Sequence, residues 1–214
     1  TLLHDIEVIH DLHFNTGIVG TRYLLDVLTE AEEIELAYKL FTQTSYPSLG
    51  YMIKEGATTV WERWENLTNA GMNSHNHIML GAVDSWLYKV LGGIKVGEEN
   101  PGFAQIKIKP HFVEKIETVQ SSLNTVKGLI VSEWMKENNI IKLKVIIPGN
   151  TAASIYFLKR YFANDFIIKY NNRKIWNGSN FNLKSAGLVD FEVKNKELIL
   201  KIGAGEYEFE IVNM

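Results

Sequence analysis

The sequence predicts an α plus β, multidomain chain, with helices in residues 1–95 followed by an antiparallel β-sandwich in residues 96–214. Two observations predict this division. In the first part, apolar residues recur three and four positions apart, which is the spacing of a helix that buries one face. In the second part, they recur at every second residue in short runs separated by Gly, Pro and Asn, which is typical of strands in a sandwich.

Four helices and one short helical turn are expected in the first part. The helices cover residues 2–10, about 18–28, about 32–43 and 74–94, and the turn covers residues 50–55. Pro47 ends the third helix, because proline cannot continue one. Each helix has a single apolar stripe, and four such stripes do not easily enclose a core. We therefore expect the helices to belong to a larger helical assembly, of which this chain holds the C-terminal part.

The fourth helix has a second stripe beside its apolar one. This stripe carries polar or small residues at helical spacing: His77, Gly81, Asp84 and Tyr88. Asn73 or Ser74 is a suitable N-cap, because either side chain could accept a hydrogen bond from the first turn. Such a helix is expected to pack against other helices on one side and to border a polar cavity on the other.

At least seven short strands are expected in the second part. They cover residues 105–109, 140–147, 153–158, 166–170, 189–193, 198–202 and 207–212. Turn residues separate them, and the segment Lys194-Asn195-Lys196 could close a hairpin. Trp134 and Trp176 are isolated tryptophans in this part, and we expect each to lie in the core or at an edge.

Composition excludes several classes of function. The 214 residues include 22 Lys and Arg against 25 Asp and Glu, a net charge of −3, so the basic excess of a nucleic-acid-binding domain is missing. No apolar run reaches the roughly 18–20 residues of a membrane span. The lack of cysteine excludes disulfides, thiol catalysis and cysteine metal sites, and leaves the cellular compartment open. We expect neither nucleic acid nor a membrane as a partner.

The densest group of candidate functional residues lies between residues 56 and 77. If its first stretch is extended, Trp61 and Arg63 point to one side, and Glu62 and Trp64 point to the other. Aromatic rings beside a carboxylate suit a sugar site, because a ring stacks on the apolar face of a pyranose while charged groups bind its hydroxyls. The carboxylate could then act as a proton acceptor. The alternative is an aromatic loop packed on helix ends, with Glu62 and Arg63 as a surface ion pair.

The two histidines of this region have less specific interpretations. A lone histidine such as His77 is more often a hydrogen-bonded core residue than a ligand-binding one, although its place at the start of a helix favours a site. His75 and His77 form a weak metal pattern, because residues at i and i+2 point apart on a helix and no third ligand follows at a metal-site interval. The sequence lacks a phosphate-binding glycine loop and a serine-nucleophile motif. We therefore expect no metal and no cofactor.

Three motifs are distinctive: Tyr46-Pro47-Ser48-x-Gly50-Tyr51-Met52, Gly56-Ala57-Thr58-Thr59-Val60-Trp61-Glu62-Arg63-Trp64 and Gly71-Met72-Asn73-Ser74-x-Asn76-His77. Together they resemble the C-terminal catalytic segment of bacterial α-L-rhamnosidases of glycoside hydrolase family 78. The resemblance also includes residues 15–21, 101–103, 108–110 and 147–151. It therefore extends over nearly the whole chain.

This resemblance implies the later helices of an (α/α)6 toroid followed by a C-terminal β-sandwich. It implies an inverting glycosidase that removes a terminal α-L-rhamnosyl unit from a rhamnose-containing glycoside or polysaccharide. Glu62 matches the general base, and His77 matches a residue that hydrogen-bonds the rhamnose. Trp61 and Trp64 match the motif as walls or supports of the sugar pocket. Inversion requires the general acid to lie roughly 6.5–9.5 Å from the base, so that a water fits between the base and the sugar.

The chain departs from the family pattern in two respects. The general acid and several rhamnose-binding residues of the family belong to an earlier segment, so the missing N-terminal part of the toroid is an expected partner and the isolated chain is expected to be inactive or nearly so. Leu49 stands where the family usually has Trp. Two other functions stay open: a non-catalytic carbohydrate-binding or structural β-sandwich module with a helical leader, and a toroidal glycosidase acting on another deoxysugar or a uronic acid.

Overall fold

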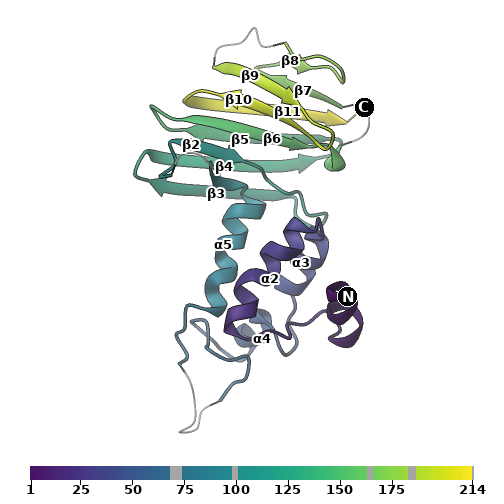
Figure 1. Cartoon of the computed structure of the whole chain (residues 1–214), viewed down its shortest axis with the longest axis vertical. Coiled ribbons are helices and arrows are strands. Elements are labelled where there is room, and N and C mark those ends of the chain that lie inside the picture. The colour runs from purple at the N-terminus through teal and green to yellow at the C-terminus, as the bar shows by residue number, and fades with distance from the viewer. Residues whose placement is uncertain (68–73, 98–100, 163–165, 183–186, 214) are drawn as a thin grey trace. The chain divides into compact units, whose positions relative to one another are not determined.

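The computed structural model describes residues 1–214 except 68–73, 98–100, 163–165, 183–186 and 214 (Figure 1). The chain divides into two compact units, Thr1–Leu87 and Tyr88–Met214. The first unit is helical, and the second consists mainly of two β-sheets, which confirms the predicted fold class. The predicted domain boundary after residue 95 stays a prediction, since compactness alone does not define a domain.

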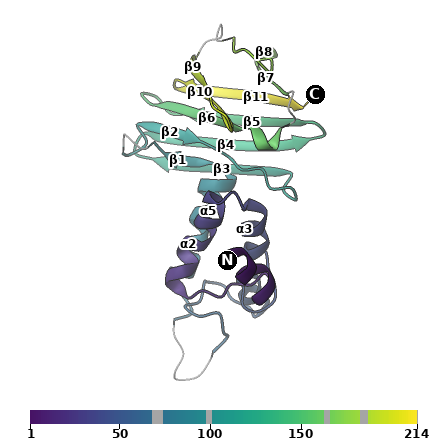
Figure 2. The same ribbon diagram turned by 45° about the vertical axis from the view of Figure 1, so that its right-hand side comes forward.

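The first unit consists of short helices joined by loops (Figure 2). In chain order they are α1 (Leu2–His4), α2 (Ile18–Glu30), α3 (Ile34–Phe41), α4 (Leu49–Lys54) and α5 (Asp84–Trp86). A π-helical turn over Asp5–Ile9 follows α1 directly, so the predicted helix over residues 2–10 is confirmed, as are those at α2 and α4. Helix α3 begins later than predicted because Glu32 adopts a left-handed conformation with φ of +67°. No helix of the described residues is both long and apolar enough to span a lipid bilayer.

Buried side chains of α2, α3 and α5 hold the first unit together. Leu28 of α2, Leu40 of α3 and Trp86 of α5 are almost fully buried. The Trp86 indole N–H donates a hydrogen bond of 2.8 Å to the Thr29 hydroxyl, and its ring centroid lies 6.1 Å from that of Phe41. A buried indole N–H needs such a partner, so this bond links α5 to α2.

The first turn of helix α4 lies close to the backbone of Gln43 and Thr44. The buried Ser48 caps this helix, because its hydroxyl accepts a hydrogen bond of 2.9 Å from the backbone N–H of Tyr51. Gly50 occupies the first turn, where a Cβ atom would lie only 2.3 Å from the carbonyl oxygen of Gln43. Only glycine therefore fits at this position without moving the backbone.

The predicted helix over residues 74–94 is wrong at both ends. The helical segment consists of a 3₁₀ turn over Leu80–Val83, α5 and a π-helical turn over Leu87–Leu91. Ile94 already belongs to the first strand. The chain from Ser74 to Met79 is irregular, so His77 lies in a loop that precedes the helix.

The physical reason is that this loop bonds to another segment. The backbone N–H of His77 donates to the carbonyl of Val60 at 2.8 Å, and the carbonyl of Ser74 accepts from the backbone N–H of Glu62 at 2.9 Å. These groups are thus unavailable for a first helical turn. Ser74 is consequently not an N-cap, and Asn73 lies outside the described residues. His77 is therefore not part of the predicted polar stripe, whose other members, Gly81, Asp84 and Tyr88, lie in the helical segment.

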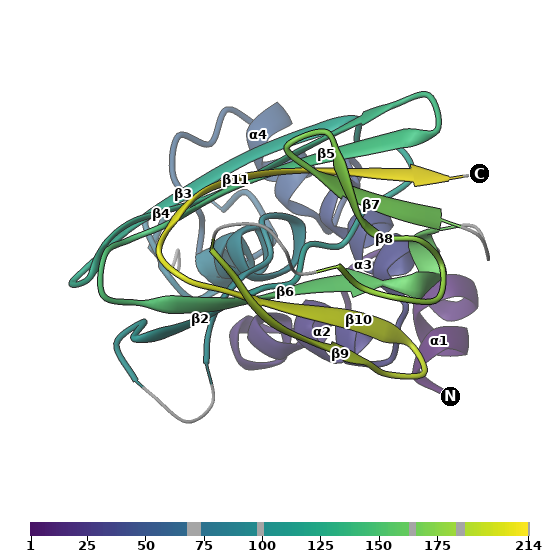
Figure 3. The same cartoon turned by 90° about the horizontal axis from the view of Figure 1, so that it is seen from above.

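Two sheets build the second unit, and Figure 3 shows them face to face as two layers. The strands are β1 (Ile94–Val96), β2 (Gln105–Ile108), β3 (Thr118–Thr125), β4 (Gly128–Glu137), β5 (Ile140–Ile147), β6 (Ala152–Leu158), β7 (Phe166–Tyr170), β8 (Arg173–Trp176), β9 (Leu188–Val193), β10 (Glu197–Ile202) and β11 (Gly205–Asn213). The five-stranded sheet has the order β1-β2-β6-β10-β9, and the six-stranded sheet has the order β3-β4-β5-β11-β7-β8. The predicted sandwich is confirmed.

All seven predicted strands are present, and they correspond to β2, β5, β6, β7, β9, β10 and β11. Lys194 and the two residues after it close the predicted hairpin between β9 and β10. The prediction missed β1, β3, β4 and β8: β1 and β8 are short, and β3 is largely polar, with no fully buried residue. One pair, β2 with β6, is parallel, so the sandwich is not entirely antiparallel.

The sandwich core contains both isolated tryptophans, as expected. Trp134 and Trp176 are each at most 5% exposed. The Trp134 indole N–H donates a hydrogen bond of 2.8 Å to the carbonyl of Leu91, and Phe112 meets the same ring edge-on at 5.0 Å. The end of the helical segment is thereby attached to the centre of β4.

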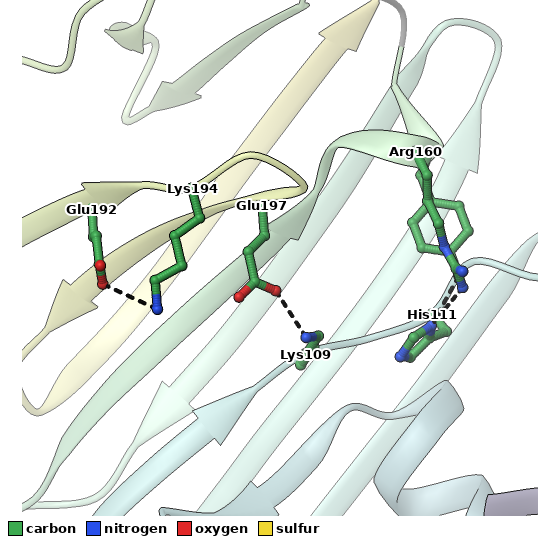
Figure 4. A network of polar contacts seen from close by, with 7 residues as sticks. Lys109, His111, Arg160, Glu192, Lys194 and Glu197 are labelled. Atoms are coloured by element: carbon green, nitrogen blue, oxygen red, sulfur yellow. Dashed lines mark hydrogen bonds and ion pairs between the residues drawn. The ribbon is translucent and has the colours of Figure 1, made fainter. Parts of the chain in front are cut away.

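A buried histidine lies beside the five-stranded sheet (Figure 4). Nδ1 of His111 lies 2.9 Å from the hydroxyl of Tyr161 and 3.1 Å from the guanidinium of Arg160. Because Arg160 can only donate, this Nδ1 is an acceptor and the ring is neutral. Burial, together with the nearby charges of Arg160, Lys95 and Lys109, lowers the pKa of His111 to about 3.

Candidate active site

Two loop segments of the first unit, residues 59–62 and 74–77, are joined by hydrogen bonds. Besides the two backbone bonds that involve Ser74 and His77, the Thr59 hydroxyl donates to the carbonyl of His75. Neither segment is helix or strand, so these bonds across the pair, rather than regular structure, fix the conformation of both. The paired loop brings Glu62 and His77, two predicted site residues, into one local structure.

The Glu62 carboxylate is anchored at one oxygen. Its Oε2 accepts a hydrogen bond of 2.9 Å from the backbone N–H of Ser74, and the side chain is half-buried. Arg63, the next residue, is exposed. The interpretation of Glu62 and Arg63 as a plain surface ion pair is thus not supported, because the carboxylate is used to bind backbone.

His77 has a defined tautomer in this loop. The backbone N–H of Met79 donates a hydrogen bond of 3.3 Å to its Nδ1. In a neutral imidazole the other nitrogen then carries the proton, so Nε2–H is the group that can donate to a ligand. The side chain is half-buried, which is compatible with a hydrogen-bonding role.

Trp61 is the buried residue of the paired loop. It is 4% exposed and forms a buried cluster with Met52 of α4 and Leu80. Leu49, the residue at the usual tryptophan position, packs partly buried against the same cluster. The imidazole of His75 stacks on Trp61 with ring centroids 4.9 Å apart. Trp61 thus attaches the paired loop, of which it is part, to this buried cluster.

Trp64 connects the loop to the beginning of α2. Its indole N–H donates a hydrogen bond of 2.9 Å to the carbonyl of Thr16, and its ring stacks on Phe14 at 5.1 Å. Trp64 also packs against the cluster that contains Trp61, so the two tryptophans do not point to opposite sides as an extended segment would require. The stacking of Phe14 on Trp64 and the hydrogen bond from Met79 to His77 were not predicted. The first joins residues far apart in the sequence and the second uses a backbone N–H, so neither has a sequence pattern.

Glu65 ends this segment next to Tyr46. Burial raises the pKa of Tyr46, and the Glu65 carboxylate, which accepts a hydrogen bond from the phenol, raises it further. The Tyr46 ring also meets Tyr51 edge-on at 5.3 Å. Glu65 thus binds a side chain, whereas Glu62 binds a backbone N–H through one of its two oxygens.

The described residues contain no cluster of three or more His, Cys, Asp or Glu side chains that could hold a metal ion. His75 and His77 are engaged separately, one on Trp61 and the other on the backbone of Met79. Gly71, Met72 and Asn73 of the third motif lie outside the described residues.

Family models match both units of the chain. Residues 2–91 match the bacterial α-L-rhamnosidase six-hairpin glycosidase domain, and residues 93–160 match the bacterial α-L-rhamnosidase C-terminal domain. The two matches meet at the end of the helical segment, close to the change from helix to strand.

Known α-L-rhamnosidases are similar to the chain over most of its length. One from Formosa agariphila is 36% identical over 208 residues, which cover 94% of this chain and 21% of the relative. The structure of an α-L-rhamnosidase from Dictyoglumus thermophilum aligns with a TM-score of 0.88 and 42% identity, covering 99% of this chain and 22% of that one.

A further structure is that of the Streptomyces avermitilis α-L-rhamnosidase complexed with L-rhamnose. It aligns with a TM-score of 0.80 and 26% identity, covering 98% of this chain and 19% of that one. The chain thus spans about a fifth of the length of these relatives. It belongs to the bacterial α-L-rhamnosidase family and carries residues of the six-hairpin glycosidase domain and of the C-terminal domain.

Proposed function

We propose that this chain supplies the general base of an inverting α-L-rhamnosidase. Glu62 removes a proton from the water that attacks the anomeric carbon of a terminal α-L-rhamnosyl unit. A general acid from a part of the enzyme outside this chain protonates the leaving oxygen. The glycosidic bond breaks with inversion, which yields β-L-rhamnose and the free aglycone. The substrate is a rhamnose-containing glycoside or polysaccharide.

The anchoring of Glu62 is the observation that supports this role. A general base must hold one oxygen within hydrogen-bond reach of the water it activates. The 2.9 Å bond from the Ser74 N–H to Oε2 restricts the rotation of the carboxylate and so orients Oε1. The Glu62 side chain is half-buried and so is not sealed from solvent.

The other three site residues have complementary roles in this proposal. His77 donates its Nε2–H to a rhamnose hydroxyl, since Nδ1 is already used by Met79. Trp61 and Trp64 act as supports of the paired loop, because Trp61 is 4% exposed and the indole N–H of Trp64 is used by Thr16. Their contribution is to hold Glu62 and His77 in position rather than to stack on the sugar.

The remainder of the six-hairpin domain is the proposed partner of the helical unit. Helix α2 exposes three apolar side chains on one face, at positions i, i+4 and i+8: Val19, Tyr23 and Val27 are between 45% and 66% exposed. An apolar stripe of this kind normally packs against another helix. The relatives are about five times longer than this chain, so they contain helices that could cover it.

The test uses the chain joined to the rest of its enzyme and an aryl α-L-rhamnoside as substrate. Replacing the base, Glu62→Gln, is expected to lower kcat by about 10²–10⁴-fold, which is the usual contribution of a general base. Azide needs no deprotonation, so it should restore part of the rate and yield β-L-rhamnosyl azide. Proton NMR of the wild-type reaction should show β-L-rhamnose as the first product.

Glu65→Gln is the matched control, since it makes the same change three residues away at a carboxylate that binds Tyr46. It should retain most of the activity. Wild-type turnover by the Glu62→Gln variant would exclude Glu62 as the base. The α-anomer as first product would exclude inversion.

A further inference from the structure

Thr59 begins the paired loop, and its side chain joins the two segments of that loop. Its hydroxyl donates a hydrogen bond to the carbonyl of His75. The other hydrogen bonds between the two segments use backbone groups or the carboxylate of Glu62. Within residues 59–62 and 74–77, all of which the structure describes, the Thr59 bond is therefore the one that a substitution can remove without changing Glu62.

The segment that accepts this bond is a turn held by its own hydrogen bonds. The hydroxyl of Ser74 accepts a hydrogen bond of 3.0 Å from the backbone N–H of Asn76 and donates one of 3.0 Å to the carbonyl of Asn76. His75 lies between these two residues, and its ring stacks on Trp61. Because residues 74–76 are joined in this way, a bond to the central carbonyl also restrains Ser74.

The backbone N–H of Ser74 is the donor that orients Glu62. It binds Oε2 of Glu62 at 2.9 Å, and the carbonyl of Ser74 accepts from the backbone N–H of Glu62, also at 2.9 Å. A displacement of the turn relative to Thr59 would therefore change the direction in which the carboxylate points. Even a small misplacement of a reacting group slows the chemical step strongly, because only near-attack geometries react.

His77 is held by contacts that do not include Thr59. Its backbone N–H donates to the carbonyl of Val60 at 2.8 Å, and its Nδ1 accepts from the backbone N–H of Met79 at 3.3 Å. Loss of the Thr59 bond should thus disturb Glu62 more than His77. The kinetic effect should then fall on kcat, which depends on the base, rather than on KM, which depends on binding of the sugar.

We propose that Thr59 is a positioning residue for the general base. Its hydroxyl holds the carbonyl of His75, and the turn passes this restraint on to Ser74. The backbone N–H of Ser74 in turn aims the carboxylate of Glu62. Thr59 itself does not touch the substrate. This role rests on the proposed function, in which Glu62 is the base.

The kinetic test uses the chain joined to the rest of its enzyme, with an aryl α-L-rhamnoside as substrate. Thr59→Val keeps the shape of the side chain but removes the donor, and it is expected to lower kcat by about tenfold while KM changes by less than about twofold. Thr59→Ser keeps the hydroxyl and should retain most of the rate.

A double variant shows whether Thr59 acts through Glu62. In the Glu62→Gln background no base is left to position, so Thr59→Val should cause no further loss of kcat. The reaction of this double variant with azide should likewise be as fast as that of Glu62→Gln alone, since azide needs no base.

Amide hydrogen exchange provides a measurement that does not depend on activity. In the 214-residue chain, followed by NMR, the amide of Ser74 should exchange at least about tenfold faster in Thr59→Val than in the wild type, and Thr59→Ser should resemble the wild type. Thr42→Val is the matched control, because it removes another exposed threonine hydroxyl that donates to a carbonyl, that of Tyr38, at the end of α3. It should leave kcat, KM and the exchange of Ser74 unchanged.

Four outcomes would overturn the inference. They are wild-type kcat in Thr59→Val, equal losses in Thr59→Val and Thr59→Ser, a loss that multiplies with that of Glu62→Gln, and unchanged exchange of the Ser74 amide. Failure of the proposed function would have a different sign: Glu62→Gln would retain wild-type turnover, whatever the rate of Thr59→Val.

Discussion

Acidification should destabilise the β-sandwich through His111. The folded protein lowers the pKa of this side chain from 6.5 to about 3, so the unfolded chain binds the proton more readily than the folded one does. The contribution of the neutral ring to stability is complete above pH 6.5 and is lost as the pH falls towards 3. Each pH unit in this window removes about 1.4 kcal/mol, which amounts to about 3 kcal/mol at pH 4.5.

The informative substitution is His111→Asn. The amide oxygen of asparagine can take the place of Nδ1 and accept from Tyr161 and Arg160, but the amide does not titrate. The variant loses ring packing and is expected to be less stable than the wild type at pH 7. Its stability should nevertheless fall less on acidification, by about 3 kcal/mol between pH 7 and pH 4.5.

Hydrogen exchange measured by mass spectrometry is the appropriate assay, because protection of the β2 and β6 amides reports opening of the sandwich itself. Exchange is compared at both pH values after correction for the intrinsic rate. The control His4→Asn alters an exposed histidine of α1 in the other unit, and it should follow the wild type. Equal loss of stability in the wild type and in His111→Asn would refute the reasoning.

Two further substitutions test packing within each unit. Trp134→Phe leaves the buried carbonyl of Leu91 without its hydrogen bond and also removes ring volume, so chemical denaturation of the sandwich should show a loss of about 2–4 kcal/mol. An unchanged denaturation midpoint would mean that this bond contributes nothing. Gly50→Ala places a methyl group against the carbonyl of Gln43 and should lower the stability of the helical unit by at least about 2 kcal/mol in thermal unfolding, whereas Gly149→Ala, where a methyl group meets open space, should cost much less.

The fold was largely predictable because the spacing of apolar residues along the chain depends on local secondary structure. Alternation in β5 and the helical spacing in α2 reflect burial of one face, which is visible in the sequence itself. Strand β3 could not be found in this way, since its segment is polar and none of its residues is fully buried. The parallel pairing of β2 with β6 depends on contacts across more than forty residues, which no local pattern encodes.

The residues of the candidate site are named from sequence motifs and stay a prediction, whereas their local geometry could not be predicted from the sequence. Motifs identified Glu62 and His77, yet a helix was predicted to begin at Ser74. Hydrogen bonds between residues 59–62 and 74–77 prevent a helix from beginning at Ser74. These bonds involve backbone groups, which every residue has, so the sequence does not reveal them. The burial of Trp61 likewise depends on Leu80, which lies nineteen positions further along the chain and reaches Trp61 only through this loop pairing.

The strand order determines where the β-sandwich can be truncated without exposing the edge of a sheet. Strand β10 is a neighbour of β6, and β11 is a neighbour of β5, so each sheet is completed by chain that follows residue 160, where the C-terminal family match ends. A protein shortened at that residue would present two unsatisfied strand edges to solvent, and such edges promote aggregation. Expression boundaries should therefore be drawn after β11, because the residues that follow residue 160 are an integral part of both layers.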